Sequence, residues 1–347
     1  MTAKATRVLA AGALSLALVG ACTEPVPEPD PDPTAETAPA VLDPTRLEAV
    51  LGDVQETLDA GDDALDPEVL QERVTGPALR MRTAEYELAR ATDGENEPTP
   101  LTMDTQVEVV AASDTFPRSV IAVSEIPEGA NLPLITGLRQ EAAREQYRLW
   151  AWARAFPGVE IPATVVPEVG SPELGPDAEE LAATPAEALS SYVARLDDPE
   201  SEGADRFTDD PFTQEYRSWV SDLNEEIEVA GEVEAAAQVG EGGVLALSTA
   251  DGGALVLGEL GFTRTLRKTV EDATLEAGGA IGDLLGEETE VQDEVSATYV
   301  GTVALHIPPA GEGATIEVLG AEAVLADVAR SGGGNADDGN ADGGNEE

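Results

Sequence analysis

The chain has 347 residues, and its 69 acidic side chains outnumber its 19 basic ones, giving a formal net charge of −50. Because phosphate binding needs clustered Lys and Arg, this balance excludes nucleic acid as a natural partner, and it also repels anionic lipid surfaces. The single Cys and the single His are too few to supply three or four soft ligands, so we expect no zinc site and no other metal site built from His and Cys. We assign no metal-ligating residue and no cofactor, and the sequence leaves calcium binding open.

The N-terminal residues have the layout of a secretory signal. Lys4 and Arg7 precede an apolar run over residues 8–19, which is shorter than the roughly 20 residues of a permanent membrane helix. The run ends in Val19-Gly20-Ala21-Cys22, which resembles a bacterial lipobox. That resemblance implies cleavage after residue 21, a diacylglyceryl group on Cys22, and a chain anchored to the outer face of the cell membrane. The alternative is an ordinary signal peptide that happens to end in Cys.

Composition divides the rest of the chain. Residues 22–43 alternate Pro with acids and predict an extended tether, while residues 331–347 are rich in Gly, Asn and Asp and predict a disordered tail. The intervening length suits two domains. We expect the first over residues 44–170 and the second over residues 184–330, with residues 171–183 as a linker.

Helix starts carry one repeated signature, a capping side chain followed by Pro. It occurs at Asp43-Pro44, Asp66-Pro67, Thr184-Pro185 and Asp210-Pro211. Apolar residues follow Pro44 and Pro211 at helical spacing, and Gly61 is the expected C-terminal cap of the first helix.

Segments rich in Val, Ile and Leu follow the helices in each half and predict strands. They begin at residues 107, 119, 243, 254, 297 and 314, and Asp251-Gly252-Gly253 is a hairpin signal between two of them. Residues 134–156 suit either strands or one long helix.

Four matches in the same order suggest an internal duplication. Pro44 corresponds to Pro185, and the segment from Arg73 corresponds to that from Arg206. The strand from Ser119 corresponds to that from Gly243, and the segment from Tyr147 to that from Tyr299. We therefore predict an α+β protein of two related units, each with N-terminal helices packed on a curved antiparallel sheet.

This element order resembles nuclear transport factor-like and cystatin-like folds, and together with the lipobox-like segment the chain is similar to uncharacterised secreted lipoproteins of actinobacteria. The resemblance implies a fold and a location. It brings no catalytic motif.

Two groups of residues are candidates for chemistry. Strand alternation predicts that His306 and Thr302 lie on an exposed face, which favours a surface histidine over a catalytic base. Five alternate residues of the first half would share one aromatic and cationic face as a ligand pocket: Arg148, Trp150, Trp152, Arg154 and Phe156. The alternative is that the two Trp and the Phe fill the core.

We therefore expect a lipid-anchored extracytoplasmic protein with a non-catalytic binding or assembly role at the cell envelope, possessing an envelope protein partner. The rival hypothesis is a binder of an unidentified small molecule, or a hydrolase that uses two carboxylates in a pocket of the first domain.

Overall fold

Four helices begin at the residue pairs that the sequence marks as helix starts. In the computed structural model, which describes residues 38–331, these are α1 (Pro44–Ala64), α2 (Pro67–Leu70), α4 (Pro185–Asp197) and α5 (Pro211–Ile227). Each cap accepts a backbone N–H: Asp43 from Arg46, Asp66 from Glu68, Thr184 from Glu187 and Asp210 from Thr213. The signal segment, Cys22 and residues 332–347 lie outside the described residues.

The first helix runs past the residue expected to end it. Gly61 lies inside α1, and the helix ends at Ala64, followed by the C-cap residue Leu65 with a left-handed φ of 48°. A Cβ at Gly61 would fall within 2.4 Å of the Leu70 side chain and 2.8 Å of the Tyr86 hydroxyl. The prediction of a cap at Gly61 is therefore wrong, because this glycine permits a close approach of neighbouring side chains.

Each half continues into a sheet. The first contains β1 (Thr105–Ala112), β2 (Arg118–Ser124), β3 (Leu134–Gln140), β4 (Arg148–Arg154) and β5 (Ser171–Pro172), in the order β4-β3-β2-β1-β5. Strands β1 to β4 pair antiparallel, and β5 is parallel to β1. Residues 134–156, for which the sequence left two possibilities, thus contain two strands.

The second sheet has longer strands in simple antiparallel order. These are β6 (Gly231–Ser248), β7 (Ala254–Lys268), β8 (Glu294–Ile307) and β9 (Glu317–Ser331). The remaining elements are α3 (Gly76–Ala91), α6 (Gly279–Leu285) and the short 3₁₀ helix η1 (Ala204–Arg206). The α+β class with helices before a sheet in each half is confirmed.

The two halves share an element order, but each strand match taken from the sequence is shifted by one strand. Parallel bridges join Val74 to Leu149 in the first half and Phe207 to Ile316 in the second. These bridges make β4 equivalent to β9, whereas the sequence matched β4 with β8 and β2 with β6. The error arises because buried strands rich in Val, Leu and Ala resemble one another.

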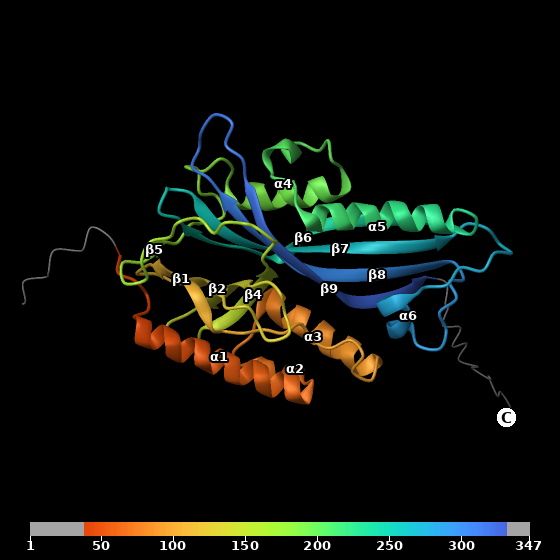
Figure 1. Ribbon diagram of the computed structural model, residues 1–347, viewed down its shortest axis with the longest axis horizontal. Coiled ribbons are helices and arrows are strands. Elements are labelled where there is room, and N and C mark those ends of the chain that lie inside the picture. Colours follow the sequence, from red (N-terminus) through yellow and green to blue (C-terminus); the bar gives the residue numbers. More distant parts are fainter. Residues whose placement is uncertain (1–37, 332–347) are drawn as a thin grey trace, which may run out of the picture. The chain divides into compact units, whose positions relative to one another are not determined.

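Helices and sheets are stacked in layers (Figure 1), and apolar side chains pack between these layers. One cluster packs α1, α2 and α3 against the first sheet, and another packs α4 and α5 against the second. A third cluster lies between the two sheets and includes Ile121, Ile135, Leu245 and Leu257. Both faces of each sheet are therefore covered over the region where the sheets meet.

The two sheets are also joined at both edges. The N–H of Phe156, just after β4, donates to the carbonyl of Leu319 in β9 over 2.8 Å. At the opposite edge, the N–H of Leu174 donates to the carbonyl of Ala246 in β6 over 3.0 Å. We call this second junction the β5–β6 seam. It lies within residues 171–183, the segment expected to be a linker.

A buried polar cluster fixes the helices of the second half. Asp210, whose side chain is fully buried, accepts hydrogen bonds from Arg195 at 3.1 Å and from the Tyr192 hydroxyl at 3.1 Å. The same carboxylate caps α5 through the N–H and the hydroxyl of Thr213. A single acid thus joins α4 to the start of α5.

Candidate functional site

The five residues predicted to share one face are divided by an irregularity in β4. Leu138 pairs with Leu149, and Gly137 pairs with Ala151, so Trp150 is an extra residue in the ladder. Such a bulge interrupts the alternation of side chains. Trp150 therefore lies between the two sheets, whereas Trp152 lies between the first sheet and the helices, and the prediction of a common face is wrong.

The same five residues have separate partners. Trp152 is fully buried, and Trp150 is 3% exposed with the Arg139 guanidinium 5.2 Å from its ring. Arg148 pairs with Glu145 at 3.1 Å, and Arg154 pairs with Glu322 of β9 at 2.9 Å. Phe156 lines a separate groove of about 340 Å³ beside the start of β9. The structure thus does not bring the five together around one pocket.

His306 is buried, contrary to the prediction of an exposed face. It is 8% exposed and Thr302 is 0% exposed, because the first sheet covers the side of β8 that faces away from α4 and α5. The His306 Nδ1 lies 3.5 Å from Glu317, and its Nε2 lies 3.7 Å from Asp251. A hydrogen bond from Thr249, followed by smaller contributions that include His306, lowers the pKa of Asp251.

A groove lies between α1 and the segment that leads into β1. It has a volume of about 520 Å³, and we call it the α1 groove. Its floor is apolar, and its walls carry five carboxylates and no basic side chain. The lining residues are Glu48, Leu51, Gly52, Gln55, Glu56, Asp59, Met103, Asp104, Thr105 and Glu108.

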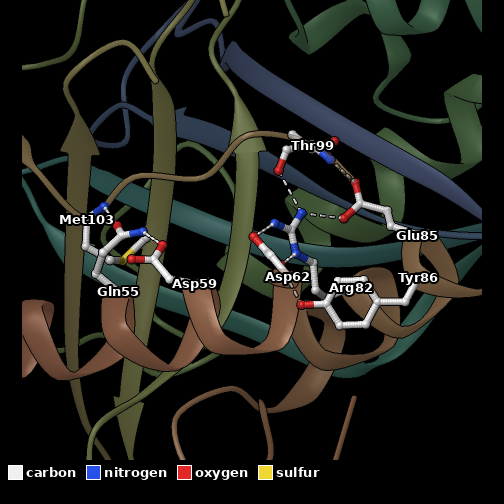
Figure 2. Close-up of polar contacts among 8 residues, drawn as sticks. All are labelled: Gln55, Asp59, Asp62, Arg82, Glu85, Tyr86, Thr99 and Met103. Carbon is white, nitrogen blue, oxygen red and sulfur yellow. Dashed lines mark hydrogen bonds and ion pairs between the residues drawn. The ribbon is translucent and has the colours of Figure 1, made fainter. Parts of the chain in front are cut away.

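One side-chain amide fixes the floor of the α1 groove (Figure 2). Gln55 donates from Nε2 to Asp59 over 2.7 Å and accepts the Met103 N–H at Oε1 over 2.7 Å. Gln55 therefore ties α1 to the segment before β1. Because Met103 and Leu51 are buried, the groove has a fixed apolar base below its carboxylates.

Further along α1, a buried arginine joins this helix to α3 (Figure 2). The Arg82 guanidinium is 1% exposed and pairs with both oxygens of Asp62, with Glu85 at 2.8 Å and with the Thr99 carbonyl at 2.7 Å. The Tyr86 hydroxyl donates to Asp62 over 2.5 Å. Burial alone lowers the pKa of Arg82, but Glu85 and Asp62 outweigh this effect and raise it.

Burial and the hydrogen bond to Asp62 raise the pKa of Tyr86. Arg82 and Tyr86 therefore stay protonated at neutral pH and act as donors that hold α1 and α3 together. Helix α1 belongs both to this network and to the wall of the α1 groove. The network therefore holds that wall rigidly in place.

Within residues 38–331, no three His, Cys, Asp or Glu side chains lie close enough together to hold a metal ion. In the same part of the chain, no helix combines the length and apolar character needed to cross a membrane.

The fold and the groove define an α+β protein with an open, acid-lined site on its first helix. The chain belongs to the family described as a domain of unknown function (DUF8094), whose model matches residues 39–328. This match spans both halves of the chain. Comparisons with curated proteins and with solved structures found no similar protein.

Sequence reasoning missed the α1 groove. The chain has 69 acidic residues, and the five carboxylates of the groove come from two segments about 50 positions apart. The helical spacing of Glu48, Gln55, Glu56 and Asp59 indicates only a solvent-exposed face of a helix. Only the packing of Met103 against α1 turns that face into a groove.

Proposed function

We propose that this chain is a lipid-anchored extracytoplasmic protein that binds a cationic partner at the cell envelope and catalyses no reaction. Cys22, after its apolar segment, would hold the chain to the outer face of the membrane, and residues 22–43 would act as the tether, as in the actinobacterial lipoproteins that the sequence resembles. The binding element would be the α1 groove.

The observation that carries this proposal is the charge of the α1 groove. Glu48, Glu56 and Asp104 line it with exposed side chains that accept no hydrogen bond within the described part of the chain. Carboxylates that are not used internally are available to a positively charged ligand. The apolar floor suits the methylene stem of a Lys or Arg side chain, since such stems pack on apolar surface while the charge stays at the rim.

A titration with a tetralysine peptide tests this proposal. We expect the substitutions Glu48→Gln, Glu56→Gln and Asp104→Asn together to weaken binding about tenfold or more, because three charges near the ligand are lost. The measurement is isothermal titration calorimetry of the chain from residue 22 onward, made at several salt concentrations.

A matched variant controls for the overall charge. Glu95→Gln, Glu97→Gln and Glu271→Gln also remove three exposed carboxylates, and none of the three lines the groove. This control should weaken binding by less than about twofold, since distant exposed charges are screened by salt. Equal weakening by both triple variants would show that tetralysine binds to the general acidic surface, and the proposal would be abandoned.

A further inference from the structure

The β5–β6 seam contains a carboxylate that is poorly accommodated when it is charged. Glu173 follows β5 and pairs with Leu247 of β6. Its Oε1 accepts a hydrogen bond from the Ser119 hydroxyl over 2.5 Å. Its Oε2 is buried and has no hydrogen-bond partner among the described residues. An ionised carboxylate in such a position carries a large desolvation cost.

Neighbouring groups do not remove this cost. The charged residues that act on Glu173 are Arg139 of β3 and Glu141 just after it, and they have opposite effects. Tyr147 is also near enough for Glu173 to raise the pKa of its hydroxyl, which is buried without a hydrogen-bond partner among the described residues. Arg139 donates from Nη2 to the Val244 carbonyl over 3.1 Å, so its guanidinium is partly used on the backbone of β6. Fully buried Ser171, two residues earlier, pairs with Ala111 of β1, and its hydroxyl also has no hydrogen-bond partner in the part of the chain that the structure describes.

Solvation of Glu173 is coupled to the seam by the backbone. The next residue, Leu174, supplies the N–H that bonds to the Ala246 carbonyl at 3.0 Å. Glu173 itself forms the bridge to Leu247, so a movement of its backbone that brings the carboxylate into water would also disturb the adjacent Leu174 hydrogen bond. Ionisation of the carboxyl therefore favours an open seam, and its neutral form favours a closed one.

We propose that Glu173 is a protonation-controlled latch that closes the junction between β5 and β6 at acid pH and loosens it at neutral pH. The direction follows from linkage. Burial, the largest effect, raises the pKa of Glu173, although Ser119 and Arg139 act in the opposite sense. A carboxyl whose pKa is raised by folding stabilises the closed form fully below its unfolded pKa, and this contribution is lost as the pH rises through the folded pKa.

Amide hydrogen exchange at Leu174 measures the latch directly. After correction for the intrinsic exchange rate, we expect the population of the open seam to fall by about threefold to tenfold between pH 7.5 and pH 5. Glu173→Gln should show the low open population already at pH 7.5 and lose most of the pH dependence. The Leu149 amide, which donates to the Arg73 carbonyl at 2.7 Å, serves as an internal reference that should not change.

Two further variants keep the test decisive. Glu141→Gln removes the nearby exposed acid that raises the pKa of Glu173, so the transition should remain and its midpoint should move to lower pH. Ser119→Ala removes a hydrogen bond that favours the ionised form, so the midpoint of the transition should move to higher pH. Exchange at Leu174 that is independent of pH in the wild-type protein, or a midpoint unmoved in Ser119→Ala, would overturn the latch.

Discussion

Replacing Arg82 with Met is expected to lower the free energy of unfolding by about 3 kcal/mol or more. The substitution keeps much of the side-chain volume but leaves the carboxylates of Asp62 and Glu85 without the cation that both contact. Breaking a buried ion pair in this way is costly because an uncompensated charge remains. Urea denaturation followed by circular dichroism gives the value.

Two companion variants separate charge from geometry. Arg82→Lys restores the charge but not the two parallel hydrogen bonds to Asp62, so we expect it to recover only part of the lost stability. Arg46→Met removes a largely exposed partner of Asp43 and should change the stability by less than about 1 kcal/mol. If Arg82→Met also lowered the free energy of unfolding by less than about 1 kcal/mol, the role assigned to the buried Arg82 network would be contradicted.

Replacing Trp152 with Ala is expected to cost about 3–5 kcal/mol of stability. The side chain is fully buried between the first sheet and the helices, and the neighbouring elements can relax only partly into the cavity that it leaves. Thermal and urea unfolding of the variant measure the loss. If the two Trp had formed a ligand pocket instead, the substitution would have left folding intact.

Phe156→Ala is the matched test on the same segment. Phe156 is only partly buried and lines the smaller groove. Phe156→Ala should therefore lower the free energy of unfolding by less than half as much as Trp152→Ala. A folded and equally stable Trp152→Ala protein would refute the packing described for this face of the first sheet.

Helix starts were predictable because their signals are local. Asp43, Asp66, Thr184 and Asp210 each accept a backbone N–H within three residues of themselves, and the following Pro fits the first helical position whatever the tertiary fold. Gly61 was misread because its role depends on Leu70 and Tyr86, which are distant in sequence.

The strand faces were less predictable because they depend on which elements cover the sheets. The prediction that side chains alternate between the two faces of β8 is correct. The exposure of His306 could not be inferred, since it depends on the first sheet packing over that face. In β4, the bulge at Trp150 changes the side-chain directions, and nothing in the local composition marks it.

The first part of β6 was missed for a compositional reason. Residues 231–239 are mostly Ala, Glu and Gly, which are poor strand formers. Pairing with β7 along Gly231 to Val239 holds them in the sheet. Tertiary pairing thus overrides local preference there.

Photo-crosslinking in intact cells tests the central claim most directly. A photoreactive residue is placed at position 56 in the α1 groove or at exposed position 95, in the full chain that carries Cys22. The account predicts a specific crosslinked partner from position 56 only, recovered with the membrane fraction, and loss of that fraction in Cys22→Ala. Equal products from both positions, or an intact chain in the cytosol with its leader uncut, would contradict it.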